Sequence, residues 1–136
     1  MIKITVDTNV FISATFWLGA SHKILELVEK KTIELILSKS IIKEYQDVLN
    51  YKEIQEKITN KNLEMRWYVQ KIASLSRIVI PKKKILIIEV DTDDNKILEC
   101  ALAGNVDYII SQDRHLLDLK EFTGIEILHP EDFLKK

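Results

Sequence analysis

The chain opens on Ile2-Lys3-Ile4-Thr5-Val6-Asp7, where branched apolar residues alternate with polar ones until an acid ends the run. This period of two and the β-branched side chains are typical of a strand. Comparable short apolar runs occur at residues 33–37, 77–80, 106–111 and 125–128. We therefore predict five strands, the first of which ends at Asp7.

Segments with helical periodicity separate the predicted strands. Ser21 is the expected cap of one helix, and either Ser38 or Ser40 is the expected cap of the next, because serine oxygens accept hydrogen bonds from the first free amides. Aspartates at 91–94 open a helix that Gly104 ends. The predicted helices lie at about residues 8–18, 21–28, 38–50, 91–104 and from 130 onward. Residues 53–75 form one or two helices, interrupted near Thr59-Asn60, and residues 113–119 are a loop with a short helix.

Strands alternate with helices along the chain, which predicts an α/β fold with a mainly parallel sheet and helices on both faces. No repeat, low-complexity segment or linker divides the 136 residues, so we expect one domain over residues 1–136. Hydrophobic residues at 46% and charged residues at 30% are ordinary for a globular protein. The formal net charge of −1 does not mark the chain as a nucleic-acid or membrane-surface binder.

Cys100 is the only cysteine, which excludes an intrachain disulfide. It lies in an apolar run without a nearby cation, so we interpret it as a core residue rather than a nucleophile. His22, His115 and His129 are scattered and form no zinc motif. The first residues do not resemble a signal peptide, and no apolar run approaches the roughly 20 residues that span a bilayer. We expect a cytoplasmic protein without membrane association.

Two acids follow predicted strands. Asp7 directly follows the first strand, and Asp113 follows the fourth by two residues. In open parallel sheets, ligands bind outside the carboxyl ends of the strands, where the strand order reverses. Both carboxylates are therefore candidates for one crevice, provided that the first and fourth strands are neighbours.

Two further acids lie on predicted helices. Glu44 falls at the edge of an apolar stripe centred on Tyr45, whereas Asp47 lies further toward solvent. Asp94 falls in the middle of the inward stripe of its helix, where burying an unpaired carboxylate is costly. Its place in the first turn favours an anion, and a bound cation would favour it more.

Each acid alone also has an ordinary explanation. Acids after strands commonly form turns, and residues 91–94 could be only a capping cluster, in which Asp91 or Asp93 competes with Asp94 for the crevice. Four carboxylates in one crevice would repel and raise one another's pKa unless a cation lay between them. Oxygen ligands favour Mg²⁺ or Mn²⁺, and such a site suits phosphodiester hydrolysis, because the metal activates water.

Four segments carry a resemblance to a known family. Val6-Asp7-Thr8-Asn9-Val10 is similar to the N-terminal signature of the PIN-domain family, and residues 44–49, 91–101 and 109–117 resemble its later acidic segments in the same order. The VapC-like toxin branch is the most similar. Each segment is a weak signal alone, but the ordered set is specific.

This resemblance implies a three-layer α/β/α domain with five parallel strands in the order 3-2-1-4-5, so that the first and fourth strands are neighbours. It also implies a homodimeric, Mg²⁺-dependent endoribonuclease that a partner antitoxin often holds inactive. The acids that match the family's quartet are Asp7, Glu44, Asp94 and Asp113. The positions that match its supporting hydrogen-bonding residues are Asn9 and Ser111.

Our hypothesis is metal-assisted hydrolysis of RNA. Asp7 would be the central ligand, with Asp94 and Asp113 as direct or water-mediated ligands. Glu44 would hold a second ion or orient the attacking water. Other function classes are a receiver domain that accepts a phosphoryl group and a catalytically silent PIN-like binding module. A receiver would carry paired acids after the first strand, whereas Asp7 stands alone.

RNA also needs cationic contacts. Arg114, Lys43 and Lys39 are candidates, whereas the run Lys82-Lys83-Lys84 could be a phosphate path but is better interpreted as a solvated face. Three aromatic residues could stack on RNA bases, but we interpret them as core or dimer-contact residues: Phe16, Trp17 and Trp67.

Overall fold

β1 lies in the middle of a six-stranded sheet with the order β3-β2-β1-β4-β6-β5. The computed structural model describes residues 1–16, 19–50, 62–86, 88 and 94–136. The strands are β1 Lys3–Val6, β2 Glu34–Leu37, β3 Arg77–Ile78, β4 Tyr108–Ile110, β5 Glu121–Phe122 and β6 Ile125–Leu128.

The five parallel strands have the predicted order, because β6 corresponds to the fifth predicted strand. The addition is β5, a short edge strand that pairs antiparallel with β6. Thr123 and Gly124 join the two strands with φ angles of 51° and 81°. Positive φ at both central residues is the geometry of a tight two-residue hairpin, and glycine adopts it without strain.

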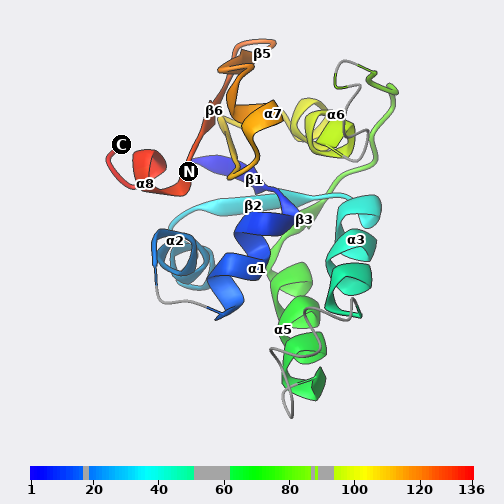
Figure 1. The fold of residues 1–136 in the computed structure, drawn as a ribbon, viewed down its shortest axis with the longest axis vertical. Coiled ribbons are helices and arrows are strands. Elements are labelled where there is room, and N and C mark those ends of the chain that lie inside the picture. The colour runs from blue at the N-terminus through cyan, green and yellow to red at the C-terminus, as the bar shows by residue number, and fades with distance from the viewer. Residues whose placement is uncertain (17–18, 51–61, 87, 89–93) are drawn as a thin grey trace.

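Helices cover both faces of the sheet, as predicted. Figure 1 shows α1, α2, α3 and α5 on one side and α6 and α7 on the other. The helices are α1 Thr8–Phe16, α2 Ala20–Glu29, α3 Lys39–Leu49, α5 Asn62–Leu75, α6 Asp94–Gly104, α7 Arg114–Leu117 and α8 Pro130–Phe133. The predicted positions of Trp17, Asp91 and Asp93 lie outside the described residues.

The helix caps agree with prediction at one serine and differ at the other. Ser38 accepts a hydrogen bond from the amide of Ile41 at 3.3 Å and so caps α3. Ser21 does not cap α2: the cap is Gly19, and Ser21 lies buried inside the helix. Its hydroxyl instead lies 3.4 Å from the side-chain nitrogen of Gln112, so a tertiary partner replaces the local one.

A continuous cluster of buried apolar side chains fills the space between the sheet and its helices. Cys100 belongs to this cluster, and burial raises the pKa of its thiol to about 11. The interpretation of Cys100 as a core residue is therefore confirmed. Trp67 is not a core residue, because 61% of its surface is exposed. Among the described residues, no helix has the length and apolar character needed to cross a membrane.

Gly104 marks the closest approach of α6 to the sheet. A Cβ atom added at Gly104 would overlap Cγ2 of Ile36 on β2, and Ile36 is fully buried. Ile36 is β-branched and cannot move its methyl group by a small rotation. The two backbones can therefore approach this closely only because residue 104 lacks a side chain.

We expect Gly104→Ala to lower the free energy of unfolding by about 2–3 kcal/mol, because the extra methyl group overpacks the core. Gly19→Ala is the matched control: a Cβ there meets nothing within 4 Å, and the expected loss is below about 1 kcal/mol. Urea unfolding curves measure both. An unchanged midpoint for Gly104→Ala would contradict the close approach of α6 to β2.

Candidate functional site

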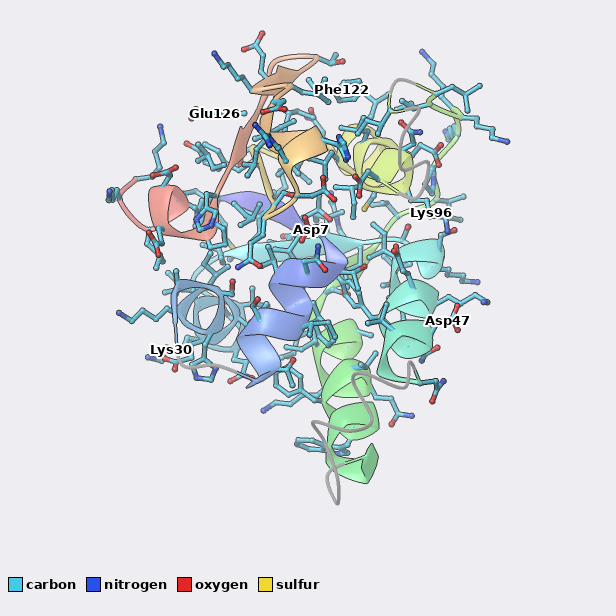
Figure 2. All side chains as sticks on the ribbon, viewed as in Figure 1. Asp7, Lys30, Asp47, Lys96, Phe122 and Glu126 are labelled. Atoms are coloured by element: carbon cyan, nitrogen blue, oxygen red, sulfur yellow. The ribbon has the colours of Figure 1, made fainter. Side chains whose placement is uncertain are left out.

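The carboxylate of Asp7 lies at the carboxyl end of β1, beside the end of β4 (Figure 2). The backbone amide of Asp7 donates to the carbonyl of Ile110 at 3.1 Å, which extends the β1–β4 ladder by one step. Its Oδ1 accepts from the amide of Val10 at 2.8 Å and so caps the first turn of α1. Its Oδ2 accepts from the hydroxyl of Ser111 and from the amide of Gln112 at 3.3 Å.

Asp7 is only 4% exposed, and burial raises the pKa of its carboxyl group. The hydrogen bonds from Ser111, Val10 and Gln112 lower this pKa, and the negative charge of Asp113 raises it further. The net shift is upward, so the three donors do not fully offset the cost of burying the charge. A cation at this position would favour the ionised form.

Asp113 is joined to Asp7 through Ser111. The hydroxyl of Ser111 donates to Asp7 and accepts from the amide of Asp113 at 2.8 Å. Asp113 is also the N-cap of α7, where its Oδ1 accepts from the amide of His115 at 2.7 Å. The two strand-end acids therefore lie close enough to repel each other, and Ser111 fixes their relative position.

Glu44 is half-buried on α3, next to Tyr45. The hydroxyl of Tyr45 donates to the carbonyl of Val6 at 2.7 Å, and its ring stacks on Phe11 of α1 with 4.3 Å between centroids. The pKa of Tyr45 is raised well above its usual value, first by burial and then by the charges of Asp7, Cys100 and Glu44. Tyr45 thus ties α3 to the residue that precedes Asp7.

Asp94 begins α6 and is 8% exposed. Further along this helix, the sulfur of Cys100 lies 3.7 Å from the hydroxyl of Thr5 and 3.6 Å from the carbonyl of Ile36. A helix that links parallel strands runs antiparallel to them, and six residues of helix span about 9 Å. Asp94 is therefore displaced from Cys100 toward the carboxyl ends of the strands, the edge of the sheet that holds Asp7.

Of the four predicted acids, the structure links Asp7 and Asp113 through Ser111. Within the described part of the chain, no group of three or more His, Cys, Asp or Glu side chains is arranged to hold a metal ion. The helices that carry Glu44 and Asp94, α3 and α6, contact each other, and α6 also contacts β1. The four-acid site and the role of Asn9, which is exposed on α1, stay predictions.

Two residues of the site were not identified from the sequence. Gln112 accepts from the hydroxyl of Ser13 at 3.0 Å and lies 3.4 Å from that of Ser21, so it braces α1 and α2 against the loop after β4. The hydroxyl of Thr8 is buried and lacks a hydrogen-bond partner among the residues described. For Gln112, its position between Ser111 and Asp113 was the one sequence signal that could have indicated a role in the site. The sequence carried no comparable signal for Thr8.

Comparison with known proteins identifies the family. The PIN domain family matches residues 3–115, most of the chain. The chain belongs to the PIN domain family. It is also 29% identical to an uncharacterized protein of Methanocaldococcus jannaschii, over 99% of this chain and 91% of that protein. PIN domains are generally nucleases, and they typically use divalent metal ions.

The strand order of this PIN domain also contradicts the receiver-domain interpretation. Receiver domains have the order 2-1-3-4-5, in which the first strand lies between the second and third. Here β1 lies between β2 and β4, and β3 is at the edge beyond β2. The receiver alternative is therefore wrong.

The residues at the end of β1 fit a divalent metal ion chemically. They offer carboxylate oxygens, which Mg²⁺ and Mn²⁺ prefer. The buried Asp7 has a raised pKa that a cation would lower. Thr8, the next residue, has a buried hydroxyl without a hydrogen-bond partner among the described residues, and this hydroxyl could serve a metal-bound water. The fit rests on the kind and burial of these donors.

Replacing Tyr45 by Phe should lower the free energy of unfolding by about 1–3 kcal/mol, because the buried carbonyl of Val6 would lose its donor. The ring stack on Phe11 would remain. Tyr68→Phe is the matched control, since the Tyr68 hydroxyl has no hydrogen-bond partner among the described residues; its expected change is within about 0.5 kcal/mol. Equal losses in thermal unfolding would contradict a role for the Tyr45–Val6 bond.

The raised pKa of Asp7 predicts a pH dependence of stability in metal-free protein. An acid with a higher pKa in the folded state stabilises the fold below its ordinary pKa of 3.8, and this stabilisation is lost as the pH rises through the folded-state pKa. The unfolding free energy of the wild type, minus that of Asp7→Asn, should therefore fall as the pH rises from about 4.

Urea unfolding in EDTA at a series of pH values measures this difference. Asp118→Asn removes a carboxylate that is 73% exposed and serves as the control for losing one surface charge. A wild-type advantage over Asp7→Asn that grows with pH would show that the hydrogen bonds outweigh burial at Asp7.

Proposed function

We propose that this PIN domain is an endoribonuclease that hydrolyses RNA phosphodiester bonds with Mg²⁺ or Mn²⁺. The observation that supports it most is the buried carboxylate of Asp7 at the end of the central strand, with a raised pKa and Asp113 beside it. A fold that holds two carboxylates against their mutual repulsion gains most from a cation between them. Members of the PIN domain family are generally nucleases, so a cation at this position would take part in phosphodiester hydrolysis.

In this proposal Asp7 and Asp113 hold the metal at the ends of β1 and β4, and Asp94 completes its ligands from the start of α6. Ser111 supports this pair, because its hydroxyl donates to the carboxylate of Asp7 and accepts from the backbone amide of Asp113. Glu44 orients the attacking water or holds a second ion. When bound, the divalent ion supplies an activated water and offsets negative charge on the phosphate.

The same proposal includes the finer features of the VapC-like branch: a homodimeric toxin that a partner antitoxin holds inactive. The exposed Trp67 on α5, which also lies 5.4 Å from the Lys71 ammonium group, is available to a second copy. Growth arrest on expression, relieved by the product of a neighbouring gene, would support the toxin role, and light scattering of the purified chain would test the dimer.

The three candidate RNA-binding cations differ in exposure and in their ion pairs. Arg114 is 90% exposed in its side chain and lies 4.0 Å from Asp118. Lys43 forms a 2.8 Å ion pair with Asp47, which confirms that Asp47 is on the solvent side of α3. We therefore favour Arg114 and the exposed Lys39 over Lys43 as phosphate contacts.

Asp7→Asn should abolish RNA cleavage while the protein remains folded. The substitution keeps the shape of the side chain but removes the charge that a divalent ion requires. Cleavage of labelled RNA in Mg²⁺ or Mn²⁺ is the activity readout. A second readout needs no turnover: Mg²⁺ should raise the Tm of the wild type and leave that of Asp7→Asn unchanged.

Glu44→Gln and Asp47→Asn form a matched pair on one helix. We expect the first to lose activity and the second, an exposed acid paired with Lys43, to keep it. Full cleavage by Asp7→Asn would refute the assignment of the central ligand. A wild type that binds Mg²⁺ but cleaves no RNA would favour the catalytically silent binding module.

A further inference from the structure

A groove with four lysines lies between the start of α3, the segment 81–86 and α6. It encloses 640 Å³. We call it the lysine groove, and the residues that define it are Lys82, Lys83, Lys84, Lys96, Asn95 and Ser40. Figure 1 shows the chain after β3 running past the top of α3 toward α6, and Figure 2 shows Lys96 at this side of the molecule.

Two side chains of α6 hold the lysine segment in place although it forms no helix or strand. Glu99 accepts a hydrogen bond from the amide of Ile85 at 2.9 Å. Asn95 accepts from the amide of Ile88 at 2.9 Å and donates to its carbonyl at 2.8 Å. Asn95 and Glu99 are one helical turn apart and so face the same way. These bonds fix the backbone that directly follows the three lysines.

Three lysines give the described lining of the groove a positive charge. Lys82, Lys83 and Lys84 are exposed, and none of them forms an ion pair with a described residue. Glu99 is the only acid in the described lining, and its carboxylate is engaged by a backbone amide. Adjacent cations in a groove repel one another and bind a polyanion with release of its counterions.

The position of the groove favours RNA as that polyanion. Asn95 directly follows Asp94, the acid at the start of α6 that approaches the end of β1. A strand of RNA cut near Asp7 could therefore continue into the groove beside α6. The described lining includes no aromatic side chain on which a base could stack, which leaves the phosphates as the contacted groups.

We infer that the lysine groove binds the RNA backbone without sequence preference and holds the substrate beside the catalytic acids. This inference rests on the proposed function. It also replaces our interpretation of residues 82–84 as a solvated face. The rival occupant is an acidic protein segment, which would use the exposed Leu86 on the lining and Ile80 nearby as apolar contacts.

The test variant is Lys82→Gln with Lys83→Gln and Lys84→Gln, and the matched control is Lys23→Gln with Lys30→Gln and Lys31→Gln. Both remove three exposed positive charges. Figure 2 shows Lys30 far across the molecule from Lys96. None of the six lysines belongs to the proposed metal site. Thermal unfolding would establish that both variants fold.

Fluorescence anisotropy in EDTA would measure the binding of single-stranded RNA oligonucleotides of two unrelated sequences at several salt concentrations. We expect the groove variant to bind both RNAs about tenfold more weakly at low salt. Its slope of log affinity against log salt should fall by about two, since each phosphate contact to a single strand contributes about 0.7. The control should match the wild type. Equal affinity and slope in the groove variant would overturn the inference.

Two further outcomes separate the inference from its rival and from the proposed function. Polyglutamate that competes as well as RNA of equal charge would assign the groove to an acidic protein segment and overturn the inference. Cleavage in Mg²⁺ is measured in parallel, where the groove variant should raise KM and leave kcat unchanged. If the protein cleaves RNA but the groove variant binds RNA as the wild type does, only the groove inference is refuted. If RNA binding depends on the three lysines but no RNA is cleaved, only the proposed nuclease activity is refuted. If the protein shows neither lysine-dependent binding nor cleavage, both proposals are refuted.

Discussion

The carboxylate of Asp7 joins three parts of the chain that are far apart in sequence. It ends β1, caps α1 through Val10, and accepts donors from Ser111 and Gln112 after β4. Hydrogen bonds to an ionised acceptor are among the stronger ones, so these contacts align the strand ends. The same burial that makes the contacts possible raises the pKa of Asp7. The arrangement of the strand ends therefore depends on the Asp7 carboxylate, whose ionised form is disfavoured by its burial.

Several other side chains fix the backbone around that charge. Tyr45 holds the carbonyl of Val6, Ser111 holds the amide of Asp113, and Gln112 braces α1 and α2. The Ser111 bond fixes the loop after β4, whereas the bonds of Tyr45 and Gln112 join segments that are far apart in the sequence. A site built on such supports keeps its geometry when a ligand binds. Asp7 and Asp113 are thus held by hydrogen bonds at the ends of neighbouring strands.

The sequence predicted those strands and helix caps whose signals lie within a few neighbouring residues. Branched apolar runs marked the five parallel strands, and the family resemblance supplied their order, which the sheet confirms. β5 has two residues, too few for a period to be visible. Ser21 was misassigned as a cap because its partner, Gln112, is 91 positions away. The hydroxyl of Tyr45 could have been anticipated, since a buried tyrosine needs a partner, but nothing local named Val6 as that partner.

α6 connects the core, the site and the surface through one rigid element. Gly104 and Cys100 set its distance from β2 and β1, Asp94 begins it near the strand ends, and Asn95 and Glu99 anchor the lysine segment. Because a helix moves as a unit, a displacement at its buried end would shift Asp94 and the anchored lysines together. The packing of two small residues against the sheet thus determines where a carboxylate and a row of cations lie relative to Asp7. In this fold the packing of the core also determines the position of the candidate metal ligands relative to the lysine groove.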